Sequence, residues 1–84
     1  SIQTERSLAV SVFPNPATDR VNIVSSEMLS SIKIIDIYGK EVFESGNIHN
    51  KEYIIETEDL SSGIYIIELC DIQNSKILKK LIKE

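Results

Sequence analysis

The sequence consists of short isoleucine-rich stretches separated by turn residues, and this pattern restricts the chain to β-structure. Its fifteen isoleucines are β-branched, so they lose rotamer freedom in a helix and pack well on a pleated sheet. Six stretches either alternate apolar with polar residues or are mostly apolar. These predicted strands are residues 8–13, 20–25, 31–38, 41–45, 52–57 and 63–70. Short strands with turn signals between them are typical of an all-β sandwich.

The last nine residues, KILKKLIKE, fit two structures. Their apolar residues fall on one face of an amphipathic helix, with the lysines mostly opposite. However, a nine-residue segment without a cap is marginal as a helix. The segment also follows the strongest predicted strand across a short turn around 73–75, where a hairpin is the simplest continuation. We therefore predict a seventh strand over 76–84.

Proline and glycine mark two of the connections. Pro14 and Pro16 in PNPATD lack amide donors and disfavour helical geometry in the preceding residues, which predicts a rigid, extended bend at a sheet edge. Gly39-Lys40 suits a two-residue type II′ hairpin, because glycine would occupy the first central position. In the strand before this hairpin, the change of phase between Ile34 and Ile35 indicates a bulge or a strand buried on both faces.

Two further segments are predicted as connections because polar and turn-forming residues dominate them. SSEMLSS (25–31) is expected to join two strands, with Met28 or Leu29 turned inward. GNIHNK (46–51) is expected to be a loop, since glycine and asparagine favour turns.

The segment EDLSSG (58–63) is also rich in turn formers. Its single apolar residue, Leu60, is expected to plug the end of the core. Gly63 begins the strongest predicted strand. We expect that this position requires glycine, either for a positive φ or for a close approach of another part of the molecule to the backbone.

The size of the chain allows one domain. At 84 residues a single modest core is expected, and we predict that 1–7 is the end of a linker and that 8–84 forms the domain. No apolar run is long enough for a membrane-spanning helix, so membrane insertion is not expected. The chain begins with serine rather than methionine, which suggests a piece of a longer precursor.

Charge is unevenly distributed along the chain. Residues 1–75 carry five basic and twelve acidic side chains, whereas 76–84 carry four lysines and one glutamate. Nucleic-acid binding needs a basic face across the domain, so this distribution argues against it. Lysines on an exposed edge strand prevent sheets from associating, and this ordinary role stands beside a second one, a recognition signal. Self-association through an edge strand also stays open.

Catalytic and metal-binding patterns are weak in this sequence. Cys70 and His49 are the one cysteine–histidine combination available, and nothing in the flanking sequence brings them together. One histidine and one cysteine cannot form a closed zinc site, and the segment DIQNS lacks an EF-hand pattern. We expect no enzyme activity, no metal and no cofactor, with Cys70 as a small core residue.

Three tyrosines offer a second binding possibility. Tyr38, Tyr53 and Tyr65 could form an aromatic platform for a sugar. The simpler interpretation, which we favour, is that each ring caps an edge of the core with its hydroxyl in water.

Four motifs, taken together, resemble a known family. PNPATD at 14–19, DIYGK at 36–40, LSSGIYIIEL at 60–69 and the terminal KILKKLIKE are similar to those of the type A C-terminal sorting domains of type IX secretion cargo from Bacteroidetes-type bacteria. Each motif alone is weak, whereas four in the right order with the basic one at the chain end are specific. The resemblance covers 12–84.

This resemblance implies both a fold and a function. The fold is an immunoglobulin-like antiparallel β-sandwich of about seven short strands, in agreement with the predicted number. The function is to direct a cargo protein from the periplasm through the outer-membrane translocon to the cell surface or the medium. A sortase-like peptidase of the machinery would then remove the domain, cutting at or before 1–7.

The resemblance also suggests roles for residues of the motifs. The expected contacts with the secretion machinery are the lysines of the tail and two residues of the neighbouring strand, namely Lys76, Lys79, Lys80, Lys83, Gly63 and Tyr65. The expected structural residues of the other motifs are Pro14, Asn15, Pro16, Asp36, Gly39, Lys40 and Leu60. The alternative function is an accessory module of a secreted enzyme, one that binds carbohydrate or spaces domains, with lysines that only keep it soluble.

Overall fold

The computed structural model describes residues 9–84, so the predicted linker at 1–7 and the first residue of the first predicted strand lie outside the described residues. Within 9–84 the chain forms β-strands and no helix. The strands are β1 (Val10–Phe13), β2 (Arg20–Asp36), β3 (Glu41–Glu56), β4 (Gly63–Asp71) and β5 (Lys76–Lys83). This part of the chain accordingly has no helix that could cross a membrane.

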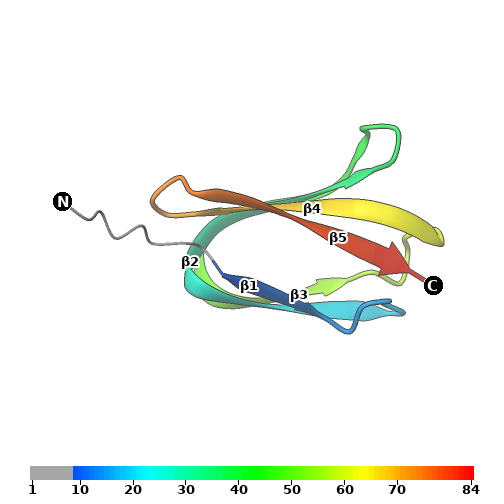
Figure 1. The fold of residues 1–84 in the computed structure, drawn as a ribbon, viewed down its shortest axis with the longest axis horizontal. Helices are drawn as coiled ribbons and strands as arrows, with labels where there is room; N and C mark the ends of the chain where they lie inside the picture. The colour runs from blue at the N-terminus through cyan, green and yellow to red at the C-terminus, as the bar shows by residue number, and fades with distance from the viewer. Residues whose placement is uncertain (1–8) are drawn as a thin grey trace.

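The strands form one hydrogen-bonded antiparallel sheet that folds into two layers, because β2 and β3 both bend (Figure 1). The first half of β2 pairs with β1 and with the second half of β3. The second half of β2 pairs with β4 and with the first half of β3, and β5 completes this layer beside β4. The predicted immunoglobulin-like antiparallel sandwich is confirmed.

The predicted number of seven strands is wrong, because two segments expected to be connections belong to strands. SSEMLSS lies within β2, and GNIHNK lies within β3. The two segments face each other at the bend, where Leu29 is the partner of Asn50 and Ser31 the partner of Gly46. Pairing keeps both polar segments extended, and register shifts on each side of Leu29 let the strands turn the corner.

The bend has an inward and an outward side. Leu29 is fully buried, whereas Met28 is 41% exposed, so Leu29 is the residue of this pair that turns inward. On β3, Asn47 and His49 have positive φ angles of 55° and 50°. Both residue types tolerate this left-handed conformation better than β-branched residues do, and Ile48 between them has no positive φ.

Alternate residues of the strands fill the space between the layers. Leu60 packs against this core from the loop after β3, as predicted. The largest fully buried side chains are Ile23, Leu29, Ile32, Ile34, Ile55, Ile67, Leu69 and Leu81. Each such side chain contributes about 1.5–3 kcal/mol when it leaves water. Since Leu81 belongs to β5, the terminal strand is part of the core rather than an appendage.

The tail is a strand, as its context predicted. β5 pairs with β4 along its whole length, from Lys76 opposite Cys70 to Lys83 opposite Gly63. Cys70 lies between two buried residues of β4 and is half-buried on the outer face of the sheet. The expectation that Cys70 is a core residue is therefore wrong.

Candidate recognition site

The DIYGK motif forms the hairpin turn between β2 and β3. Asp36 Oδ1 accepts hydrogen bonds from the N–H groups of Tyr38 and Lys40, both at 2.9 Å. The Asp36 N–H donates to the Lys40 carbonyl, so the loop between these two residues has three members and ends with Gly39. Gly39 has a φ of 83°, which favours glycine. The predicted two-residue type II′ turn is therefore wrong, and a three-residue turn with glycine in the left-handed position takes its place.

The same turn occurs again between β4 and β5. Asp71 Oδ1 accepts hydrogen bonds from the N–H groups of Gln73 and Ser75, at 2.9 and 2.8 Å. Asn74 takes the left-handed position with a φ of 69°. Sequence reasoning missed this repeat, although DIYGK and DIQNS share an aspartate, an isoleucine and a residue that tolerates positive φ.

The LSSGIY segment closes the same end of the sandwich as the DIYGK turn. Tyr65 is buried, and its hydroxyl donates a hydrogen bond of 2.7 Å to the carbonyl of Ser61. Lys83 Nζ donates to the carbonyl of Leu60 at 3.1 Å. Gly63 has a φ of 153°, outside the range that other residues readily adopt, so the positive-φ alternative is the one observed.

The DIYGK turn and the LSSGIY segment face each other across an open cleft of about 750 Å³. Tyr38 and Lys40 line it from the turn, and Ser62 and Ile64 line it from the other side. Two motifs that are separate in the sequence therefore meet at one end of the molecule.

The three tyrosines do not share one exposed surface. Tyr38 is 86% exposed, whereas Tyr65 is only 6% exposed. Tyr53 is half-buried, and its hydroxyl donates to Ser45 Oγ at 3.1 Å. The expectation that all three hydroxyls lie in water is therefore wrong for Tyr53 and Tyr65.

The proline bend after β1 binds the outer edge of β5. Asn15 Nδ2 donates to the carbonyl of Lys80, and Asn15 Oδ1 accepts from the N–H of Ile82, both at 3.0 Å. Ala17 continues this contact by donating its N–H to the Ile82 carbonyl at 2.7 Å. Residues 15–17, here named the clasp, thus act as a short extra strand. Sequence reasoning predicted the bend at a sheet edge but missed this contact.

The four lysines of β5 lie on two faces of the sheet. Lys79 and Lys83 alternate with the buried Leu81 on the inner side and are half-buried. Lys76 and Lys80 lie on the outer face and are exposed. The alternation of side chains along β5 thus places two lysines of the motif on the inner side and two on the exposed outer face.

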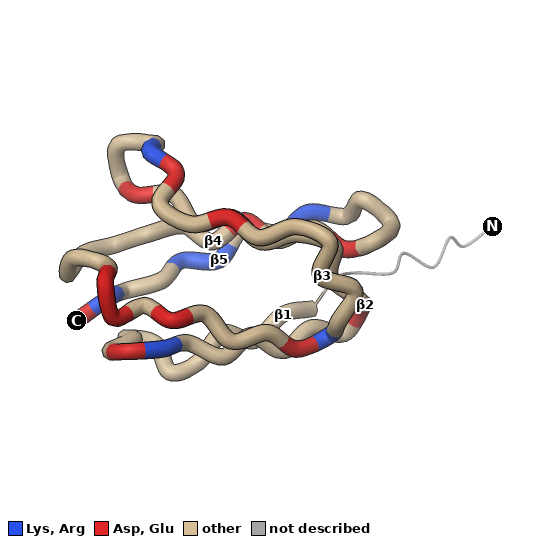
Figure 2. The backbone as a smooth tube through the Cα atoms, turned by 180° about the vertical axis from the view of Figure 1, so that it is seen from behind, with Lys and Arg blue, Asp and Glu red and all other residues tan. Residues whose placement is uncertain are grey.

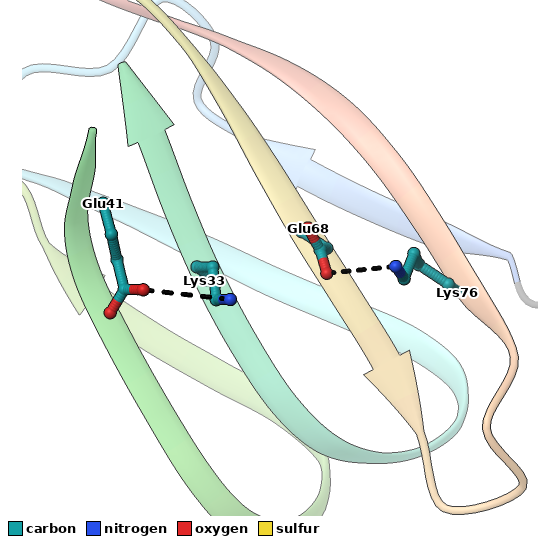
Figure 3. A network of polar contacts seen from close by, with 4 residues as sticks. All are labelled: Lys33, Glu41, Glu68 and Lys76. Atoms are coloured by element: carbon teal, nitrogen blue, oxygen red, sulfur yellow. Dashed lines mark ion pairs between the residues drawn. The ribbon is translucent and has the colours of Figure 1, made fainter. Parts of the chain in front are cut away.

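Among residues 9–84, one of the two exposed lysines of β5 forms an ion pair on the outer face, and the other does not. Lys76 Nζ lies 3.3 Å from Glu68 Oε2, on the same face as a second pair in which Lys33 Nζ lies 3.8 Å from Glu41 Oε1 (Figure 3). Among residues 9–84, no carboxylate lies within ion-pair distance of Lys80. Within this described part of the chain, the charge of Lys80 at the edge of the sheet is therefore uncompensated.

Half of the β5 edge has no backbone partner in the part of the chain that the structure describes. Backbone groups alternate in direction along an antiparallel strand, so those of Lys76 and Leu78 point away from β4, as those of Ile82 do. The clasp occupies Ile82 but does not reach Lys76 or Leu78. We refer to Lys76–Lys80 as the open edge.

Comparison with known proteins identifies the family. The model described as "Secretion system C-terminal sorting domain" matches residues 11–84. The chain belongs to this family. The prediction of a type IX sorting domain, made from the four motifs, is confirmed.

Two known proteins contain a part that is similar to this sorting domain. It is 35% identical over 74 residues to an endo-acting ulvan lyase from Formosa agariphila, covering 87% of this chain but only 14% of that protein. Its fold matches PorZ, a surface component of the type IX secretion system of Porphyromonas gingivalis, with a TM-score of 0.72 and 22% identity. That match covers 89% of this chain and 11% of PorZ. The sorting domain thus corresponds to a small part of each relative.

Within the sorting domain, the expected site residues fall into two places. Asp36, Lys40, Leu60, Gly63 and Tyr65 line the cleft at one end of the sandwich. The clasp and the lysines of the tail meet along β5, where Lys83 links back to Leu60. The clasp and the LSSGIY segment therefore contact the terminal strand, whereas the DIYGK turn lies across the cleft from the LSSGIY segment.

Proposed function

We propose that this sorting domain directs a larger cargo protein across the outer membrane through the type IX secretion machinery. Membership of the sorting-domain family supports this proposal. The short share of the ulvan lyase and of PorZ that the chain covers supports a domain attached to a longer protein. The cargo would pass through the periplasm and end at the cell surface or in the medium.

The single observation that carries the proposed recognition is the open edge. Within residues 9–84, the outward backbone groups of Lys76 and Leu78 have no partner, and they lie beside two exposed lysines on a strand that pairs with β4 along its whole length. A receptor strand could pair with such a backbone and read the lysine charges at the same time. Lys79, Lys83, Gly63 and Tyr65 would contribute by holding the strand rather than by direct contact.

The second proposed step is removal of the domain after export. We infer that a sortase-like peptidase of the machinery cuts at or before 1–7, which precede β1 in the sequence. A cut there would separate the cargo from the domain without breaking any of the strands of the sandwich. Mass spectrometry of the exported cargo would give the new C-terminus, and a cut inside β1 or later would contradict this inference.

The test of the sorting function is a fusion of residues 1–84 to a reporter that carries a periplasmic signal peptide. In a host with the type IX machinery the reporter should appear outside the cell, and in a strain without the translocon it should remain in the periplasm. A reporter that stays in the periplasm of the competent host would contradict the proposal.

The structure affects the choice of variants for this test. Deletion of the tail would remove the buried Leu81 and expose β4, so loss of export would not distinguish folding from recognition. Reversal of Lys79 together with Lys80 has a similar weakness, because Lys79 is half-buried on the inner side. Charge reversal at Lys76 and Lys80 changes the outer face alone.

A further inference from the structure

A second strand edge of the domain complements the open edge. β3 pairs only with β2, so its other side has no strand partner among residues 9–84. Acidic residues occur at intervals along β3, and lysines occur on β5 (Figure 2). The segment Glu52–Glu56 follows the positive-φ residues Asn47 and His49 and is the regular end of this strand. We refer to Glu52–Glu56 as the acidic edge.

The two edges have the same pattern of side chains with opposite charge. On the acidic edge the outer face presents two exposed glutamates on either side of Ile54, which is 53% exposed. On the open edge the outer face presents two exposed lysines on either side of Leu78, which is 58% exposed. Neither glutamate has an ion-pair partner within residues 9–84. Each edge therefore exposes an apolar residue between two like charges.

The backbone groups of the acidic edge also face outward at the required positions. Thr57, the residue after β3, donates its N–H to the carbonyl of Asp19, the residue before β2. Because direction alternates along β3, the N–H and C=O groups of Ile54 point away from β2. The same alternation directs the groups of Leu78 away from β4. An antiparallel pair that aligns Ile54 with Leu78 would therefore form hydrogen bonds in both directions.

This alignment brings opposite charges together at both ends. It places a glutamate opposite each lysine, in the pairs Glu56 with Lys76 and Glu52 with Lys80. Cross-strand pairs of opposite charge stabilise a sheet, and the apolar pair between them removes two exposed side chains from water. The pairing thus satisfies the uncompensated charge of Lys80.

At the Glu52–Lys80 end of the alignment, one backbone donor and one backbone acceptor already have partners within their own chain. The Glu52 N–H already donates to Asn50 Oδ1 at 3.1 Å, and the Lys80 carbonyl already accepts from Asn15 at 3.0 Å. These are the donor and the acceptor that would otherwise bind each other. The Glu52 carbonyl and the Lys80 N–H stay available for the second bond of that pair. The acidic edge and the open edge therefore both end at this aligned pair, Glu52 with Lys80.

Pairing of two identical edges is unfavourable, because it would bring like charges together. Two open edges aligned on Leu78 would place Lys76 opposite Lys80 twice, and two acidic edges aligned on Ile54 would place glutamates opposite each other. Like charges directly opposite each other destabilise a sheet. Only the unlike pair combines matched backbone with matched charge.

We propose that the open edge of one copy of this chain pairs with the acidic edge of a second copy, head to tail and antiparallel. After pairing, one copy keeps its acidic edge free and the other keeps its open edge free, so the assembly can add further copies at both ends instead of closing as a symmetric dimer. The contact covers Lys76 and Lys80, and it would compete with any receptor that reads them. This proposal does not depend on the sorting function.

The test uses the 84-residue chain in sedimentation velocity at increasing concentration and low salt. The average mass should rise beyond that of a dimer and should fall again at high salt, which screens exposed charges. Leu78→Pro and Ile54→Pro each remove an N–H that points away from the domain's own sheet, a position that tolerates proline. Each variant alone should stay monomeric, and circular dichroism should show its fold retained.

The decisive sample is the equimolar mixture of these two variants. Leu78→Pro still supplies an acidic edge and Ile54→Pro still supplies an open edge, so the mixture should form a dimer that does not grow. A monomeric mixture would overturn the proposal. Association of Leu78→Pro at the wild-type level, or a wild-type chain that stays monomeric throughout, would do the same.

A charge exchange keeps the test informative if a proline variant does not fold. Lys80→Glu and Glu52→Lys should each weaken association about tenfold, and their mixture should recover it, because the altered edges are complementary again. Glu44→Lys, outside both edges, is the matched control and should associate like the wild type. If Glu52→Lys associates as strongly as the wild type, the contact lies on another surface and the proposal is wrong.

Discussion

The two halves of β5 differ although they belong to one lysine-rich motif. The second half is tied into the molecule: Leu81 is buried, Ile82 is bound by the clasp and Lys83 donates to the Leu60 carbonyl. The first half is the open edge, in which the outward side chains are exposed and the outward backbone of Leu78 has no partner within 9–84. A single terminal strand thus combines a fixed half with an accessible half.

This difference explains why composition alone cannot assign the tail a role. Lysines in both halves look equivalent in the sequence, but Lys83 bonds to a backbone carbonyl while Lys80 has no carboxylate nearby in the described part of the chain. A domain that must be read by another protein needs its signal held rigidly, since ordering a flexible segment on binding costs conformational entropy. The fixed half supplies this rigidity to the accessible half.

The largest expected contrast comes from truncating one leucine in each half. Leu81→Ala should lower the free energy of unfolding by about 2–5 kcal/mol, because it leaves a cavity in the core. Leu78→Ala should change it by less than about 0.5 kcal/mol, as expected for an exposed site. Urea unfolding of both variants measures the contrast, and equal losses would show that the halves do not differ.

Glycine at the start of β4 tests how the fixed half is anchored. Gly63→Ala forces a side chain into a φ of 153° opposite Lys83, at a cost of about 1–3 kcal/mol in unfolding free energy. Gly46→Ala is the matched control, since it has no positive φ and open space around it. Thermal unfolding should therefore rank Gly63→Ala well below Gly46→Ala, and the reverse order would contradict the backbone argument.

The clasp is expected to have a smaller effect. Asn15→Ala removes two exposed hydrogen bonds to β5, which should lower the unfolding free energy by about 1–2 kcal/mol. Hydrogen exchange should also become faster at the Ile82 amide, which loses its acceptor. Faster exchange at Leu78 with no change at Ile82 would place the clasp elsewhere.

The smallest expected difference in unfolding free energy is between substitution of an inner lysine and of an outer lysine of β5. Lys83→Met removes a partly buried hydrogen bond to the Leu60 carbonyl and should cost about 0.5–1.5 kcal/mol. Lys80→Met should be close to neutral, because its charge has no partner among residues 9–84. Chemical denaturation of the pair resolves this difference, and a larger loss for Lys80→Met would reverse the assignment of roles.

Much of the fold follows from local sequence patterns. Stretches of alternating or mostly apolar residues located β1 to β4, and the context of KILKKLIKE correctly favoured a strand over a helix. The strand number was wrong because SSEMLSS and GNIHNK are polar, and pairing with residues far away in the sequence keeps them extended. Such a contact depends on residues far apart in the sequence, which composition does not reveal.

The site was less accessible to sequence reasoning for the same reason. Side chains of a strand alternate between its two faces, so the lysines of β5 fall into an inner and an outer pair. The burial of Leu81 is what shows which pair faces the core. The contact of Asn15 with β5 joins residues at opposite ends of the chain and has no local signal. In contrast, a special backbone role for Gly63 was predicted, as either a positive φ or a close approach, and the positive φ is the one observed.

The most direct test of the account is export of a reporter fused to residues 1–84 with Lys76→Glu and Lys80→Glu together. The matched control reverses Lys33 and Lys51, which changes the net charge equally at positions outside β5. We predict that the first variant stays in the periplasm with a nearly unchanged unfolding midpoint, while the control is exported. Export of the first variant at the wild-type level, or retention only when the domain unfolds, would contradict recognition through the open edge.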